Sequence, residues 1–106
     1  MTGLATPARG QIWRYEPVLA RDNRSTLRLI VSSDSINHAD LPTAFAVHIV
    51  PEASDSLLFV TVEPHGWAAA GTLEQVMRRR LSEHVGTVSA ESMEPVDIAL
   101  RALLDL

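Results

Sequence analysis

The sequence predicts a mainly β fold with α, a small antiparallel barrel of five to six strands with a C-terminal helix. Short apolar or alternating segments recur along the chain, separated by stretches rich in proline, glycine and polar residues. One helical pattern closes the chain, with apolar residues spaced to line one face: Met93, Val96, Leu100, Leu103 and Leu104. Because 106 residues suffice for one core and not for two, we expect a flexible arm over residues 1–8 and a single domain over residues 9–106.

The first strand is expected at residues 11–16, where side chains that suit opposite faces alternate. Pro17 ends this strand. Residues 17–25 follow as a loop of polar and turn-forming residues, which includes Arg21 and Arg24. The loop is longer than a tight hairpin turn, and that length favours a mobile or a functional segment.

The segment from Arg24 to Asn37 holds the expected central strand. Its apolar run, Leu29-Ile30-Val31, is typical of a strand buried on both faces, and polar residues stand before and after it. Arg28 directly precedes the run. Cations at the rim of a rigid sheet are well placed to meet an anionic partner, so we expect function at this entrance.

The next two strands are expected at residues 43–51 and 56–62, and their short connection predicts a hairpin between them. A turn over residues 63–66 leads towards a fifth strand at residues 72–76.

A single helical turn is expected at residues 78–81 and a short strand at residues 84–88, before the C-terminal helix. The start of that helix depends on Pro95, which lacks a backbone N–H. With Ser92 as the N-cap, Pro95 falls at the third helical position, where no intrahelical bond is lost. A start at Ser89 would place Pro95 one turn deeper and require a distortion, so Ser92 is preferred.

Charge and composition exclude several classes of protein. The net charge of −4 argues against a protein that coats nucleic acid non-specifically, while leaving room for a local basic site. The chain has no cysteine, which excludes disulfides and thiolate chemistry. No apolar run approaches the roughly 20 residues that span a bilayer, and no signal-peptide pattern opens the chain. We therefore expect a cytoplasmic protein without a membrane partner.

Several short motifs occur in order along the chain. They are Arg9-Gly10-Gln11-Ile12-Trp13, a Ser-x-Asp-x-x-Asn pattern after the central strand, Leu73-Glu74-Gln75-Val76, Arg80-Leu81, and an ending with Gly86, Ser89, Met93, Val96-Asp97 and Ala99-Leu100. Their order and spacing resemble the MazF/PemK toxin family, the RNA-cleaving relatives of the gyrase poison CcdB. The resemblance runs from Arg9 to Leu106.

This resemblance implies an SH3-like barrel, a homodimer, inhibition by a small antitoxin, and cleavage of single-stranded RNA without a metal. In that reaction the ribose 2′-OH attacks the adjacent phosphate. The site must take a proton from the 2′-OH, stabilise negative charge and protonate the leaving 5′-oxygen. Family members use an arginine followed by proline at the entrance to the central strand, and a threonine at the end of the third strand.

This chain differs from the family at both of those positions. Aligned on the apolar run, Thr26 stands where the arginine belongs, and Val50-Pro51 stands near the threonine position. The candidates for catalysis are therefore Arg24, Arg28 and His48, because guanidinium suits phosphate and imidazole titrates near neutral pH. The alternatives are a solvated loop position for Arg24, an ion pair for Arg28, and a hydrogen-bonded structural role for His48.

Further candidates for RNA binding are Arg21 and the run Arg78-Arg79-Arg80, which would contact RNA phosphates or an acidic antitoxin segment. A solvated charged face is the alternative for the run. Trp13, Tyr15 and Trp67 are candidates for base stacking, with core packing or a dimer contact as the alternative. The four histidines show no metal-ligand spacing and no nucleotide-binding motif occurs, so no metal or other cofactor is expected.

Two functions remain open at this point. One is a toxin that cleaves RNA, and the other is a non-catalytic module that binds its antitoxin or a gyrase-type target. The chain also resembles CcdB around Arg28 and at Ile49-Val50-Pro51. CcdB carries its gyrase contact on a C-terminal aromatic residue, whereas this chain ends Leu103-Leu104-Asp105-Leu106.

Overall fold

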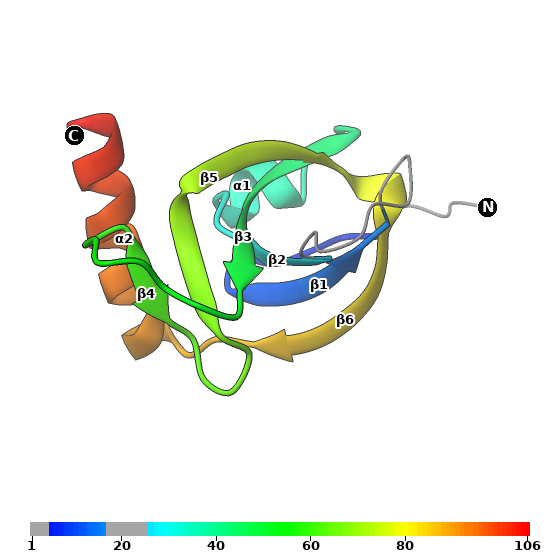
Figure 1. Ribbon diagram of the computed structural model, residues 1–106. Coiled ribbons are helices and arrows are strands. Elements are labelled where there is room, and N and C mark those ends of the chain that lie inside the picture. Colours follow the sequence, from blue (N-terminus) through cyan, green and yellow to red (C-terminus); the bar gives the residue numbers. More distant parts are fainter. Residues whose placement is uncertain (1–4, 17–25) are drawn as a thin grey trace.

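The computed structural model describes residues 5–16 and 26–106, whose strands form a six-stranded antiparallel sheet (Figure 1). The elements are β1 (Gln11–Tyr15), β2 (Leu27–Ile30), α1 (Asp34–Asn37), β3 (Thr43–Val50), β4 (Phe59–Thr61), β5 (Trp67–Met77), the 3-10 turn η1 (Arg78–Arg80), β6 (Leu81–Thr87) and α2 (Ala90–Leu104). The strand order across the sheet is β4-β5-β3-β2-β1-β6. The mainly β class with a C-terminal helix is therefore confirmed.

The sheet is strongly curled, because β5 arcs over the other strands (Figure 1). The backbone N–H of Met77, at the end of β5, donates to the Tyr15 hydroxyl on β1 at 3.0 Å. The curl does not close. Within the described residues the order starts at β4 and ends at β6, and no pairing joins these edges. The predicted barrel is thus corrected to an open, curled sheet. Its edge strand β4 has only three residues that could pair with a further strand.

Apolar clusters lie on both faces of the sheet, because successive side chains of a strand point to opposite faces. The outer cluster packs under α2 and contains Ile12, Leu29, Val31, Val47, Ile49, Val62, Ala68, Met93 and Val96. The inner cluster lies on the face turned away from α2 and contains Ile30, Ala44, Ala46, Val76 and Leu81, with Trp13 and Tyr15 packed against it. β2 contributes to both clusters, as expected for a central strand.

Arg9 and Gly10 fix the start of β1 against the C-terminal helix. Gly10 has a φ of +92°, and a Cβ at this position would lie 3.2 Å from the Val88 carbonyl oxygen, so only glycine fits without strain. The Arg9 guanidinium donates to the Val31 carbonyl and forms a salt bridge with Asp97 on α2. The first motif of the sequence therefore connects the sheet to α2.

The Ser-x-Asp-x-x-Asn pattern builds the turn that contains α1. The buried Asn37 donates from Nδ2 to the Ser32 carbonyl at 2.9 Å and to Asp34 Oδ1 at 3.0 Å. The Arg9 backbone N–H donates to the same Asp34 oxygen at 2.8 Å. These two hydrogen bonds, with the one from Arg9 contributing most, hold the pKa of the Asp34 carboxyl below its ordinary value.

Two expectations about the middle of the chain are wrong. β3 and β4 do not form a hairpin, because β5 lies between them in the sheet. The fourth strand is also shorter than expected, covering Phe59–Thr61 only. The turn expected at residues 63–66 is present and connects β4 to β5, where the Val62 N–H donates to the Gly66 carbonyl at 2.8 Å. β5 begins at Trp67, so the alanine-rich residues 68–70 belong to the strand.

The C-terminal helix begins one turn earlier than expected. Its N-cap is Ser89, whose Oγ accepts the Ser92 N–H at 3.2 Å. With this start, Met93 lies in the outer cluster and Val88 packs against that cluster, while Pro95 lies inside the helix and leaves one backbone hydrogen bond unmade. Among the described residues, no helix is long and apolar enough to cross a membrane.

Candidate active site

Arg28 and His48 face each other across two neighbouring strands. β2 and β3 pair in a register that sets Arg28 directly opposite His48. Directly opposed side chains project from the same face of a sheet. That face is the inner one, because Arg28 alternates with Leu29 of the outer cluster and His48 with Val47. The fold therefore brings together two of the residues predicted to be catalytic.

Glu74 of β5 connects the two side chains. Arg28 Nε donates to Glu74 Oε2 at 2.7 Å, and His48 Nε2 lies 3.2 Å from the same oxygen. We call these three residues the Arg28–Glu74–His48 cluster. If His48 Nε2 carries the proton that it donates to Glu74, Nδ1 is the basic atom of the neutral ring. The carboxylate thus orients the imidazole and the guanidinium together.

The guanidinium of Arg28 is also held on its other sides. Its Cζ lies 5.1 Å from the centroid of the Tyr15 ring, a cation–π contact, and Nη1 donates to the Leu27 carbonyl at 3.1 Å. The side chain of Arg28 is 10 % exposed, against 22 % for His48 and 36 % for Glu74. The cluster is therefore most exposed at Glu74, and the partial desolvation of Arg28 strengthens its attraction to the Glu74 carboxylate.

The other arginines that the sequence singles out lie elsewhere. Arg21 and Arg24 fall outside the described residues. Arg78 is buried at 5 % exposure, and its Nη2 donates to the Asn37 carbonyl and to the Ile36 carbonyl at 3.1 Å. Ile36 and Asn37 are the last two residues of α1, so the Arg78 guanidinium caps the C-terminal end of that helix.

Arg79 and Arg80 remain at the surface between β5 and β6. Arg79 is exposed, and Arg80 is partly exposed with Nη1 3.4 Å from the Glu16 carbonyl. The run of three arginines thus divides into one structural residue and two residues that face solvent. A charge run in the sequence does not show this division, which follows from the 3-10 turn that η1 makes.

The cluster combines a guanidinium, a carboxylate and an imidazole, which are the kinds of group that can assist internal attack on a phosphodiester. A buried guanidinium stabilises the negative charge that develops on the phosphate, and an oriented imidazole moves a proton. Within the described ranges, no group of three or more histidine, aspartate or glutamate side chains is arranged to hold a metal ion.

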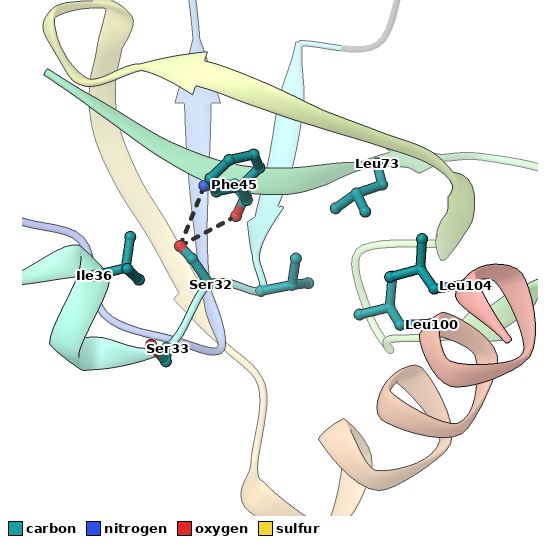
Figure 2. A pocket seen from close by; sticks show the side chains of 8 residues that line it. Ser32, Ser33, Ile36, Phe45, Leu73, Leu100 and Leu104 are labelled. Atoms are coloured by element: carbon teal, nitrogen blue, oxygen red, sulfur yellow. Dashed lines mark hydrogen bonds between the residues drawn. The ribbon is translucent and has the colours of Figure 1, made fainter. Parts of the chain in front are cut away.

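An apolar concave surface lies near the C-terminal end of α2 (Figure 2). It is an apolar groove with a volume of about 320 Å³, lined by Val31, Ser32, Ser33, Ile36, Phe45, Leu73, Leu100 and Leu104. The Ser32 hydroxyl accepts the Phe45 N–H at 3.1 Å and so fixes one wall. The groove carries no charged side chain, which suits an apolar partner surface and not a reacting phosphate.

Glu74 is the member of the cluster that sequence reasoning missed. It belongs to the Leu73-Glu74-Gln75-Val76 motif, where it carries no assigned role. The available signal is the alternation with Val76, which places Glu74 on the inner face. What the sequence does not show is the register of β5 on β3, which sets Glu74 opposite Ala46, one pleat from His48.

Comparisons with known proteins agree with the fold. Residues 8–104 match the family model described as PemK-like, MazF-like toxin of type II toxin-antitoxin system. An endoribonuclease from a mycobacterial species is 25 % identical over 97 % of this chain and 95 % of its own, with a TM-score of 0.81. An endoribonuclease from a mycobacterial species in complex with its cognate antitoxin is 24 % identical over 94 % and 96 %, with a TM-score of 0.82.

MazF from Deinococcus radiodurans has a similar fold, with 19 % identity over 96 % of this chain and 99 % of its own and a TM-score of 0.76. A search of curated protein sequences gives no significant match. The family model covers nearly the whole chain, and the curled sheet with its C-terminal helix agrees with it. The chain therefore belongs to the PemK-like, MazF-like toxins of type II toxin-antitoxin systems.

Proposed function

We propose that this toxin is a metal-independent endoribonuclease that cleaves single-stranded RNA at the Arg28–Glu74–His48 cluster. The observation that carries the proposal is the shared Glu74 oxygen, which holds a buried guanidinium and an imidazole side by side. Attack by a 2′-OH needs one group that takes a proton and another that stabilises the phosphate. The 25 % identity to a mycobacterial endoribonuclease supports the same reaction class.

The strand register supports a displaced version of the family's site. The family's arginine position falls at Thr26 and its threonine position near Val50. Continuing the β2–β3 register by one pleat sets Thr26 opposite Val50, on the face that carries Arg28 and His48. Arg28 lies two residues after Thr26, and His48 lies two residues before Val50. Because β2 and β3 are antiparallel, both side chains are displaced from the family's positions in the same direction along the sheet, by roughly 7 Å.

The roles follow from the chemistry of each side chain. His48 takes the proton of the 2′-OH through Nδ1, Arg28 stabilises the charge on the phosphate, and Glu74 positions both. The 2′-oxygen bonds to phosphorus as the bond from phosphorus to the 5′-oxygen breaks, and the leaving 5′-oxygen takes a proton from solvent water. Products of this reaction end in a 2′,3′-cyclic phosphate and a 5′-hydroxyl. Arg24 and Arg21, which precede β2 in the chain, are proposed as further phosphate contacts.

The proposed partners follow the family. We propose a homodimer in the cytoplasm whose activity is blocked by a cognate antitoxin, as one similar mycobacterial endoribonuclease is found in complex with its antitoxin. The exposed Arg79 and the partly exposed Arg80 would attract RNA phosphates or an acidic segment of the antitoxin. Both partners would then compete for the same positively charged approach.

Incubation of the purified protein with a long single-stranded RNA in EDTA tests the proposal. We expect cleavage by the wild type, a loss of about 10² to 10³-fold in Arg28→Ala, and a loss of about 10² to 10⁴-fold in His48→Ala. Arg14→Ala is the matched control, because Arg14 is an exposed arginine on β1 paired with Glu83. Unchanged cleavage by the double variant R28A/H48A would refute the assignment.

A non-catalytic module is the alternative function. The observation that favours it is the apolar groove beside α2, which resembles a protein-binding surface more than a substrate site (Figure 2). In that case the wild type would bind a protein partner tightly and leave RNA intact in the same assay.

A further inference from the structure

Trp13 and His84 form an aromatic stack on two neighbouring strands. Their strands pair in a register that sets Trp13 of β1 opposite His84 of β6. The ring centroids lie 5.5 Å apart and the ring planes differ by 21°. Trp13 is half-buried against the inner cluster, whereas His84 is exposed. The His84 imidazole is therefore the ring of the stack that faces solvent. We call the stacked pair the Trp13–His84 shelf.

Both rings of the shelf are held in place by hydrogen bonds. His84 Nε2 lies 2.8 Å from the Gly86 carbonyl oxygen and 3.1 Å from Thr87 Oγ1, while Trp13 Nε1 donates to Gln11 Oε1 at 2.9 Å. An exposed side chain on an edge strand ordinarily rotates freely and loses that freedom when it binds a ligand. Here the ring is already fixed, so less entropy is lost when another flat group stacks on it.

The shelf lies in line with the candidate active site. The β1–β2 register sets Trp13 opposite Arg28, and Arg28 is opposite His48 on the next strand. His84, Trp13, Arg28 and His48 thus form one transverse row on the inner face of four neighbouring strands. Neighbouring strands lie about 4.8 Å apart, so His84 is roughly 10 Å from Arg28 along this row.

We propose that the Trp13–His84 shelf is a base-binding subsite for single-stranded RNA, which receives the base of a nucleotide next to the cleaved linkage. The inference rests on the proposed function, because it places this base beside the phosphate held by Arg28. Every base has a π-face that stacks on an aromatic ring, so the shelf adds affinity with little base preference. A protein with a net charge of −4 gains little affinity from its overall field, which makes such a stacking contact valuable.

The test is a binding titration with a 2′-O-methyl RNA oligonucleotide of mixed sequence, which lacks the attacking hydroxyl and is not cleaved. The chain has two tryptophans, so a Trp67→Phe background leaves Trp13 as the only indole reporter. We expect the oligonucleotide to quench Trp13 emission. His84→Gln, which keeps a polar side chain but loses the ring, should weaken binding about tenfold or more, whereas His84→Tyr should restore it.

His38→Ala is the matched control, because His38 is exposed in the turn that contains α1 and should bind the oligonucleotide as the background protein does. Undiminished binding by His84→Gln, or no binding by the background protein, would overturn the proposed subsite. Cleavage of unmodified RNA distinguishes the two proposals. If the wild type cleaves RNA and His84→Gln binds the oligonucleotide normally, the proposed subsite is wrong and the proposed nuclease activity stands. If binding depends on the His84 ring but the wild type cleaves no RNA, the shelf binds RNA and the proposed nuclease activity is wrong.

Discussion

At the scale of single residues, the proposed reaction depends on a carboxylate that takes no part in bond making or breaking. Glu74 Oε2 contacts both Arg28 Nε and His48 Nε2, so it sets the distance and orientation between the cationic group and the base. Glu74 is a positioning residue in this account. A displacement of about 1 Å in such a site costs up to about 10²-fold in rate, which makes Glu74 a sensitive point.

Replacement Glu74→Gln tests this role. The amide keeps the size of the side chain but loses the charge that orients Arg28 and His48. We expect the single-turnover rate of RNA cleavage to fall about 10 to 100-fold, with a smaller change in binding of the 2′-O-methyl oligonucleotide. Gln75→Ala, one residue away on the opposite face of β5, should cleave at the wild-type rate. A wild-type rate in Glu74→Gln would show that the carboxylate has no positioning role.

At the scale of elements, α1 is anchored by a short polar network. The Asp34 carboxyl accepts hydrogen bonds from Arg9 and Asn37, which lower its pKa in the folded state. A carboxyl with a depressed folded pKa stabilises the fold above its unfolded value of about 4, and this contribution is lost as the pH falls through the folded pKa. The turn is therefore most stable at neutral pH.

Comparison of the wild type with Asp34→Asn isolates this effect, since asparagine keeps an acceptor oxygen but no charge. Urea unfolding should show the wild type to be more stable near neutral pH, and the difference should shrink as the pH is lowered to about 2, because the contribution of Asp34 is lost as the pH falls through its folded pKa. An equal difference at both pH values would contradict the role of the ionised carboxyl.

The start of α2 gives a second prediction for an element. Ser89→Ala removes the side-chain oxygen that accepts the Ser92 N–H, and should lower the free energy of unfolding by about 1 kcal/mol. Pro95→Ala restores a helical N–H and should raise it, by up to about 3 kcal/mol. Denaturant titrations at neutral pH measure both. Loss of stability in Pro95→Ala would mean that the helix needs the proline conformation.

Sequence reasoning located most elements but not all of their partners. The alternation in β1 and the apolar run in β2 depend on local burial, and both strands are correctly predicted. The pairing of β3 with β5 depends on contacts between distant segments, so the expected hairpin with β4 was wrong. The predicted start of α2 at Ser92 is wrong, because the helix tolerates the one backbone hydrogen bond that Pro95 cannot donate and begins at Ser89, with Met93 buried in the outer cluster. Arg28 and His48 were singled out from the chain, whereas Glu74 emerged only with the β5 register.

At the scale of the whole molecule, a net charge of −4 limits how RNA is held. Long-range attraction is weak, so affinity must come from a few local contacts with phosphates and from stacking. In the described part of the chain, the cationic contacts that we propose are Arg28, Arg79 and Arg80.

The domain organisation, with an arm over residues 1–8 and one domain over residues 9–106, stays a prediction.

The salt dependence of binding tests this electrostatic account. Each phosphate contact to a single strand contributes about 0.7 to the slope of log K against log salt, so Arg28, Arg79 and Arg80 together with Arg21 and Arg24 predict a slope of about −3.5. The double variant R79A/R80A should reduce the slope by about 1.4, while Arg14→Ala should leave it unchanged. Titrations of the 2′-O-methyl oligonucleotide over a range of salt concentrations give both values. An unchanged slope in R79A/R80A would exclude these arginines from the RNA contact.

The central claim is that Arg28 and His48 act together as one reaction centre. The most direct test is the single-turnover rate of RNA cleavage in EDTA for the two single variants to alanine and the double variant. Groups that act as a unit give non-additive losses, so we predict that R28A/H48A is about as slow as the slower single variant, and that the wild type releases 2′,3′-cyclic phosphate ends. Wild-type rates in the double variant would contradict the account.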